Sequence, residues 1–225
     1  GDVTAFHDYS IKVWNFETGE LVRSFPNLHS SDIVSLAVTR NGRYVVSASL
    51  DNTLRIWDFE TGDSLRTIST RCSSTADMAV ASNSGYIVFT SGGLSDKAIN
   101  IWDIETAQLL RTIEDTSSIR DVVISSDEKR IISLSDKIKV WDVETSNKVN
   151  TQLASERHRY HVTSMTATLD SQFLVSASGD GSLKIWNLET RELLQTISAH
   201  EIGVEAVAVT SDSKYIVSAS HDNTL

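Results

Sequence analysis

The stretch LRIWDFET, residues 54–61, is one of five near-copies along the chain. The others read IKVWNFET (11–18), INIWDIET (99–106), IKVWDVET (138–145) and LKIWNLET (183–190). Their tryptophans lie 43, 45, 39 and 45 residues apart: Trp14, Trp57, Trp102, Trp141 and Trp186. This regularity predicts a fold that is built from copies of one supersecondary unit.

Within each unit, apolar and polar residues alternate with the period of a β-strand. In the second unit we expect strands at 33–38, 44–49, 53–57 and 64–68, separated by turns. Helical periodicity of useful length is absent from the sequence. Four short antiparallel strands repeated in this way predict an all-β chain, a β-propeller of radially packed sheets.

The composition is that of an ordinary globular protein, with 40% hydrophobic and 22% charged residues among 225. The sequence contains neither a membrane-spanning apolar run nor a signal peptide at its start, and Cys72 is the only cysteine. We therefore expect a cytoplasmic or nuclear protein. Its net charge of −10 argues against direct binding to nucleic acid and anionic lipid.

The repeated units resemble the WD-repeat family, the G-protein-β-like propellers, over essentially the whole chain. The family fingerprint is a histidine, a Ser-x-Ser-x-Asp turn and a Trp-Asp pair at fixed spacing. Here His29 precedes Asp51 by 22 residues, and Trp57 follows six residues later. The same spacings recur in two later units: His158, Asp180 and Trp186, then His200 and Asp222.

The resemblance implies a buried structural relay, in which the imidazole, a serine hydroxyl, the turn aspartate and the indole N–H bond to one another. In the second unit the candidates are His29, Ser47 or Ser49, Asp51 and Trp57. The two serines face the same side of their strand, so the sequence does not choose between them. The later candidates are His158, Ser176 or Ser178, Asp180 and Trp186, then His200 and Asp222.

Two catalytic interpretations compete with this structural one. A His, Ser and Asp brought together could form a hydrolase triad, but recurrence in several units and the indole next to the serine favour a structural device. His158 and His161 could bind a metal, although no third ligand is evident nearby. With no phosphate loop or nucleophile elbow, we expect no enzyme activity, no metal and no cofactor.

Two units depart from the pattern. The third has Arg71 at the histidine position and an insertion at 92–94, and the fourth has Asp115 there and a turn shortened around residues 135–136. Both should be looser or held by other contacts. Simple sequence drift is favoured over a docking role for them.

The repeat divides the chain as a single propeller region, 1–225. We expect partial blades at 1–30 and 200–225, and complete blades at 31–70, 71–115, 116–157 and 158–199. Aligned on the turn aspartates, the chain starts inside a second strand and stops inside a third. About five blades' worth are present, so we expect a fragment of a seven-blade or larger propeller.

By the same resemblance, partners bind the face that carries the loops before strand one and between strands two and three. The candidate residues on this face are His7, Leu50, Asp32, Arg120, His161, Glu205 and His221, with Gly179 at the corresponding turn position. The Glu-Thr turns on the opposite face form an acidic surface, which is more simply explained as solvated turns.

The predicted function is a non-catalytic scaffold that binds other proteins within an intracellular complex. The alternative is a regulatory or sensor domain of a larger signalling enzyme, such as a nucleotide-binding or kinase polypeptide.

Overall fold

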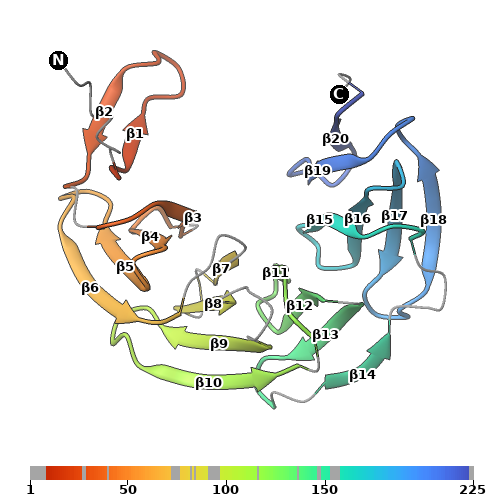
Figure 1. Ribbon diagram of the computed structural model, residues 1–225, viewed down its shortest axis with the longest axis horizontal. Coiled ribbons are helices and arrows are strands. Elements are labelled where there is room, and N and C mark those ends of the chain that lie inside the picture. The colour runs from red at the N-terminus through yellow and green to blue at the C-terminus, as the bar shows by residue number, and fades with distance from the viewer. Residues whose placement is uncertain are drawn as a thin grey trace, which may run out of the picture. The chain divides into compact units, whose positions relative to one another are not determined.

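The computed structural model describes residues 9–26, 29–39, 41–71, 77–81, 83, 85–90, 97–115, 117–135, 137–145, 148–152 and 158–222, with side chains outside 148–152. Within these ranges the regular secondary structure consists of β-strands alone (Figure 1). The strands form antiparallel sheets in which chain neighbours pair, so the described fold is all-β, as predicted.

We number the sheets along the chain. Sheet 1 is the hairpin of β1 (Lys12–Trp14) and β2 (Leu21–Ser24). Sheet 2 contains β3 (Ile33–Val38), β4 (Tyr44–Ser49), β5 (Thr53–Asp58) and β6 (Ser64–Ser69). Sheet 3 contains β7 (Asp77–Ala81), β8 (Tyr86–Thr90), β9 (Ala98–Asp103) and β10 (Leu109–Glu114).

Sheet 4 contains β11 (Asp121–Ile124), β12 (Arg130–Leu134), β13 (Ile138–Asp142) and β14 (Lys148–Gln152). Sheet 5 contains β15 (Val162–Ala167), β16 (Phe173–Ser178), β17 (Ser182–Asn187) and β18 (Leu193–Ser198). Sheet 6 is the hairpin of β19 (Val204–Val209) and β20 (Ile216–Ser220). The strands predicted for the second unit agree with sheet 2 to within one residue.

The chain divides into two compact units, 1–112 and 113–225. In the first unit, Val46 and Ile56 of sheet 2 lie in one buried apolar cluster with Ile87 and Phe89 of sheet 3. In the second unit, a cluster joins sheets 4 and 5, and a smaller one joins sheets 5 and 6. Burying each such side chain contributes roughly 1.5–3 kcal/mol relative to exposing it, so contact between sheet faces stabilises each unit.

The turns between the second and third strands require unusual backbone. Asn52 and Gly181 occupy the same place in sheets 2 and 5, with φ of 65° and 79°. A Cβ built at Gly181 would lie 2.3 Å from the carbonyl oxygen of His200, so only glycine fits against the entry to sheet 6. At Gly181 the tight turn brings the ends of β16 and β17 close to the backbone segment that leads into β19.

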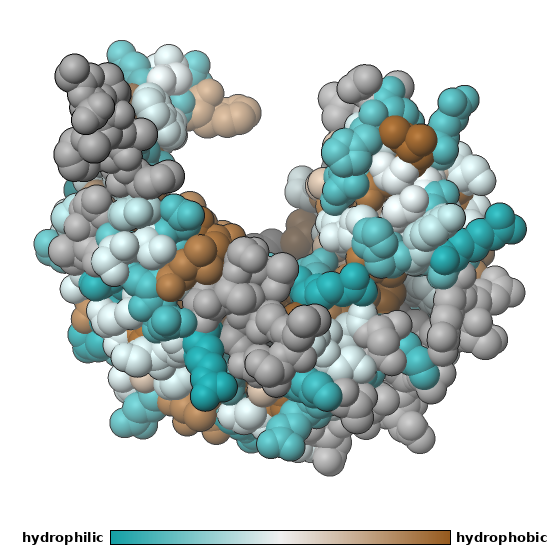
Figure 2. Space-filling model, viewed as in Figure 1, coloured by the Kyte–Doolittle hydropathy of each residue, from teal (hydrophilic) through white to brown (hydrophobic). Residues whose placement is uncertain are grey.

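Some apolar side chains remain exposed. β3 carries Leu36 and Val38, each about half exposed, and apolar surface is visible over this strand in Figure 2. Trp14 of sheet 1 is 58% exposed, whereas Trp57 of sheet 2 is 1% exposed and packs edge-on against Phe25. The burial of each tryptophan therefore depends on the sheet that precedes it.

Candidate functional site

A buried chain of hydrogen bonds links the strands of sheet 2. The imidazole Nε2 of His29 lies 2.7 Å from the hydroxyl of Ser47, and Nδ1 lies 2.9 Å from a carboxylate oxygen of Asp51. The indole N–H of Trp57 donates to the same hydroxyl at 2.9 Å. One set of protons satisfies every group: the Nδ1–H of a neutral imidazole donates to Asp51, and Ser47 donates to Nε2.

The environment favours this arrangement of charge. Burial lowers the pKa of His29, although the hydrogen bond to Asp51 opposes that change. Burial alone would raise the pKa of Asp51, but hydrogen bonds from Thr53, His29 and the Ser30 amide outweigh it and hold the pKa at about 2. A neutral imidazole next to a carboxylate is therefore the stable state at neutral pH.

Ser49 lies outside this chain of bonds. Its hydroxyl donates to the carbonyl oxygen of Ser31 at 3.0 Å and accepts from the Asp51 amide at 3.2 Å. The structure thus separates the two serines that the sequence left as alternatives. Ser47 joins the imidazole to the indole, and Ser49 fixes the start of the turn to the segment before β3.

Sheet 5 repeats the arrangement with one change. Ser176 lies 2.8 Å from Nε2 of His158 and accepts the Trp186 indole N–H at 2.9 Å. Nδ1 of His158 lies 2.9 Å from the hydroxyl of Ser182, which donates to Asp180 at 2.6 Å. The serine hydroxyl bridges the imidazole and the aspartate, as Thr53 does in sheet 2, but the direct distance from Nδ1 to the carboxylate is longer here, 3.5 Å instead of 2.9 Å.

The other serine of this turn, Ser178, again lies outside the relay. Its hydroxyl accepts from the Asp180 amide at 3.2 Å and donates to the Tyr160 carbonyl at 3.4 Å. Ser49 and Ser178 therefore have the same local role in their two sheets.

Sheet 6 contains a third relay, and its serine was not among the predicted residues. His200 lies 2.9 Å from Asp222 through Nδ1 and 2.9 Å from Ser218 through Nε2. The spacing from Ser218 to Asp222 is that of Ser47 to Asp51, so the repeated Ser-x-Ser-x-Asp pattern was a signal that could have found it.

Sheet 4 replaces the imidazole with an ion pair. Asp115 stands at the histidine position, and its carboxylate pairs with the Lys139 ammonium, with both side chains at most 5% exposed. Ser133 still accepts the Trp141 indole N–H at 2.8 Å. The ion pair is therefore the other contact that was expected to hold this unit. The sequence analysis missed Lys139, the cation that a buried Asp115 requires.

Sheet 3 lacks the acceptor altogether. Phe89 occupies the position of Ser47, and the buried indole nitrogen of Trp102 has no hydrogen-bond partner among the described residues. Arg71, at the histidine position, is exposed. The insertion at 92–94 lies outside the described residues, as does the turn residue at 136 in sheet 4.

The relays fix the loops that carry the predicted binding residues. In sheet 2 the Leu50 amide donates to the Asp32 carbonyl at 2.9 Å, and in sheet 5 the Gly179 amide donates to the His161 carbonyl at 3.0 Å. Asp32 and His161 are exposed, and Leu50 is half-buried. In each of these sheets a backbone hydrogen bond therefore joins the residue before the turn aspartate to the residue before strand one. We call each such pair, Leu50 with Asp32 and Gly179 with His161, a paired surface spot.

The remaining binding candidates vary in their surroundings. Arg120 is exposed and donates to the Ser135 carbonyl at 2.9 Å. His221 and Glu205 of sheet 6 form an exposed ion pair, with 3.2 Å between Nε2 and a carboxylate oxygen. His7 lies outside the described residues.

The metal site considered for His158 and His161 has no support among the described residues. His158 is engaged by Ser176 and Ser182, and the described part of the chain holds no group of three or more His, Cys, Asp or Glu side chains suited to a metal ion. In the same ranges, no helix has the length and hydropathy required to cross a membrane.

A family model described as "WD domain, G-beta repeat" matches residues 19–58, 150–187 and 191–225, which together span just over half of the chain. The chain belongs to the WD-repeat family. The WD-repeat resemblance seen in the sequence is thereby confirmed, and the antiparallel sheets described above are consistent with part of a WD-type β-propeller. Domains of this family generally mediate protein–protein interactions and are generally non-catalytic.

Two comparisons extend this result. The chain is 29% identical over 203 residues to a WD repeat-containing protein WDS homolog of Arabidopsis thaliana, covering 88% of this chain and 38% of that protein. It is also similar to the crystal structure of the computationally designed Ika8 protein, with a TM-score of 0.77 and 27% identity, covering 96% of this chain and 64% of the designed one. The chain thus spans less than two thirds of either relative.

Proposed function

We propose that this WD-repeat chain is a non-catalytic scaffold that holds partner proteins within an intracellular complex. The observation that carries the proposal is a contrast within sheets 2, 5 and 6. The relay residues repeat and are buried or half-buried, whereas the surface residues at the same end of the strands differ: the paired surface spots Leu50 with Asp32 and Gly179 with His161, and in sheet 6 the ion pair of His221 with Glu205.

The chemistry of the relay supports binding rather than catalysis. Ser47 accepts the Trp57 indole N–H, and its own proton is directed to His29, so its hydroxyl is engaged by groups of the same sheet. The hydroxyl is buried, with 0% exposure. A nucleophilic serine must reach a reacting carbon, and this one is enclosed by its own sheet.

The same bonds favour tight association. Because Asp51 accepts from the Ser30 amide and Ser49 donates to the Ser31 carbonyl, the loop before β3 is already ordered before a partner arrives. Binding then costs less conformational entropy than it would for a free loop. A rigid loop with a variable tip is what a protein-binding platform requires. The proposed location is the cytoplasm or nucleus, on the sequence grounds given above.

The test compares how much partner protein is captured by variants at the two opposite ends of sheets 2 and 5. The native polypeptide would be isolated with its partners by mild cross-linking and affinity capture, and the partners quantified by mass spectrometry. Leu50→Asp and His161→Glu alter the paired surface spots. Glu60→Lys and Glu189→Lys alter exposed turns at the other end of sheets 2 and 5 and serve as charge-changing controls.

We expect the spot variants to lose partners about tenfold, equivalent to about 1.4 kcal/mol, while the controls retain them. If no protein is enriched above background, or if the controls lose partners equally, the proposal is wrong.

A further inference from the structure

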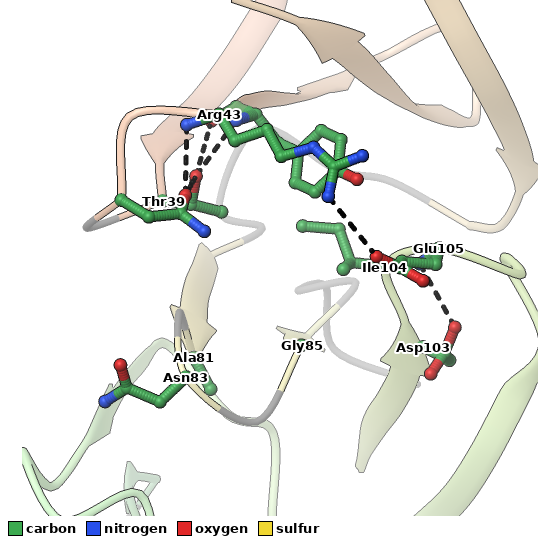
Figure 3. Close-up of a pocket in the computed structure, with 10 residues that line it drawn as sticks. Thr39, Arg43, Ala81, Asn83, Gly85, Asp103, Ile104 and Glu105 are labelled. Carbon is green, nitrogen blue, oxygen red and sulfur yellow. Dashed lines mark hydrogen bonds and ion pairs between the residues drawn. The ribbon is translucent and has the colours of Figure 1, made fainter.

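A groove lies between sheets 2 and 3 within the first unit, at the ends of the strands away from the paired surface spots. Figure 3 shows the β3–β4 turn on one side, with Thr39 and Arg43, and Asn83 and Gly85 of sheet 3 on the other. Its volume is about 340 Å³. A second hollow of about 400 Å³ shares part of the same lining and continues to Leu65 and Arg66 of β6.

The floor common to both hollows is apolar. Tyr44 and Ile104 are 7% and 3% exposed and belong to the core between the two sheets. The Arg43 guanidinium lies 4.8 Å from the centroid of the Tyr44 ring and 3.6 Å from a carboxylate oxygen of Glu105. Figure 3 shows this ion pair crossing the groove above Ile104.

The equivalent junction between sheets 4 and 5 is closed by hydrogen bonds. There Arg130 stands at the position of Tyr44 and donates to the Leu188 carbonyl at 3.0 Å, and the Asp127 amide donates to the Ser171 hydroxyl at 3.0 Å. In sheet 3, Gly85 stands where sheet 5 has Gln172. A Cβ built at Gly85 would meet only Ile104, at 3.7 Å, so this position leaves space.

The side chains around the Leu65 end are cationic on a chain of net charge −10. Arg43 and Arg66 line it opposite Glu105. Arg66 donates one hydrogen bond to the Leu65 carbonyl, at 2.7 Å. Because a guanidinium group has five N–H donors, this bond leaves donors for a ligand. The Arg43–Glu105 pair is 62% and 67% exposed, so a competing carboxylate displaces Glu105 at little cost.

We propose that this groove binds an extended peptide segment of a partner protein, in which an acidic side chain lies next to an aliphatic one. The carboxylate pairs with Arg43 and Arg66, and the aliphatic side chain covers Leu65 and Ile104. At the Leu65 end charge complementarity selects the acidic residue, because Arg43 and Arg66 line it with one carboxylate, Glu105. The other carboxylate of the groove, Asp103, lines the first hollow. This inference rests on the proposed function as a protein-binding domain and assigns it a second surface.

The test is selection from a random-peptide display library on the immobilised protein, followed by fluorescence polarisation with the enriched peptides. The binding variants are Arg43→Glu and Glu105→Gln. The matched control is Lys214→Glu, which makes the same kind of change at the equivalent turn position of sheet 6, where Lys214 is 72% exposed. Because all three residues are exposed, circular dichroism should show unchanged folds.

We expect enriched peptides with an acidic residue beside an aliphatic one. Arg43→Glu should weaken binding about tenfold or more, as for an arginine at the centre of an interface. Glu105→Gln should strengthen it about two- to fivefold by freeing Arg43 from an exposed ion pair. Lys214→Glu should leave it unchanged.

Three outcomes would overturn the inference: basic peptides are enriched, no peptide is enriched, or binding is insensitive to Arg43→Glu. If His161→Glu instead weakens binding of the selected peptides, the proposal for the groove is wrong while the proposed scaffold function stands. If neither surface retains any protein or peptide, both proposals fail.

Discussion

Ser47 and Ser49 lie two residues apart on β4, yet their hydroxyl groups have different consequences for the fold. The register explains the choice: Val45 pairs with Trp57, so the indole reaches diagonally to the next residue on that face, Ser47. Ser49 pairs with Thr53 at the turn, beyond this reach. The sequence predicted the residue types and their spacing, but choosing the serine required the register.

Replacing each serine by alanine should separate these two roles. Ser47→Ala leaves Nε2 of His29 and the indole N–H of Trp57 without their shared buried partner, so we expect a loss of about 2–3 kcal/mol in the free energy of unfolding. Ser49→Ala should cost less, about 1 kcal/mol, because the two hydrogen bonds that it removes are local contacts with loop backbone, at 3.0 and 3.2 Å. Urea denaturation measures both. Equal losses would contradict the assignment of Ser47 to the relay.

Acid should destabilise the protein in two stages. Burial lowers the pKa of His29 and His158 below the ordinary 6.5, so the unfolded state takes up protons first and stability falls as pH drops below that value. Asp51, with its pKa held at about 2 instead of 3.8, adds a further loss as pH falls below about 4.

Thermal unfolding measured across this pH range checks the expectation. His29→Gln should be less stable at neutral pH but show a smaller decrease in Tm on acidification from about pH 7 to pH 5, because one buried imidazole no longer titrates. An unchanged pH dependence in this variant would show that His29 does not contribute to the first stage.

At the scale of a single sheet, the same strand pairing is held by different chemistry in sheets 2 and 4. The sequence predicted that the fourth unit lacks the histidine relay. It did not predict the ion pair, because the position of Lys139 also carries a basic residue in sheets 2 and 5, where no aspartate replaces the histidine. In sheets 2 and 5 those equivalents, Arg55 and Lys184, bond to Thr67 and Thr196 on the neighbouring strand.

Removing one partner of the buried pair should destabilise sheet 4 strongly. Asp115→Ala or Lys139→Met each leaves an uncompensated charge, and we expect a loss of about 3–5 kcal/mol. The double variant should lose less than the sum of the two. A double-mutant cycle in urea provides the measurement, and strictly additive losses would show that the two charges do not stabilise one another.

At the scale of the whole molecule, the local features of the fold were predictable and the contacts between sheets were not. Strand alternation depends on adjacent residues, so the strands of sheet 2 could be placed to within one residue. Phe16 repeats the position of Ile104, yet it is fully exposed while Ile104 is 3% exposed. That difference depends on whether another sheet covers the face, which the repeat alone does not encode.

Two apolar faces among the described residues, on sheets 1 and 6, predict concentration-dependent self-association of the 225-residue polypeptide. Sheet 1 exposes Trp14 and Phe16, and sheet 6 exposes Tyr215 and Val217, whose equivalents in sheet 2, Tyr44 and Val46, are buried. Two different faces on one chain form head-to-tail contacts. Phe16→Ser should therefore lower the average mass seen by sedimentation velocity at high concentration.

Leu110→Ser is the control, because Leu110 is 52% exposed on the outer strand β10 and outside both faces. If the two variants reduce association equally, general surface hydrophobicity rather than the faces explains it.

The tryptophans of the repeat give the protein a set of internal spectroscopic probes. The indoles of Trp57, Trp141 and Trp186 each donate to a buried serine, that of Trp102 meets no described acceptor, and Trp14 is exposed to water. Five indole N–H resonances, from three kinds of environment, would report on five separate sheets. Local opening could then be timed sheet by sheet from solvent exchange of these protons, without any added label.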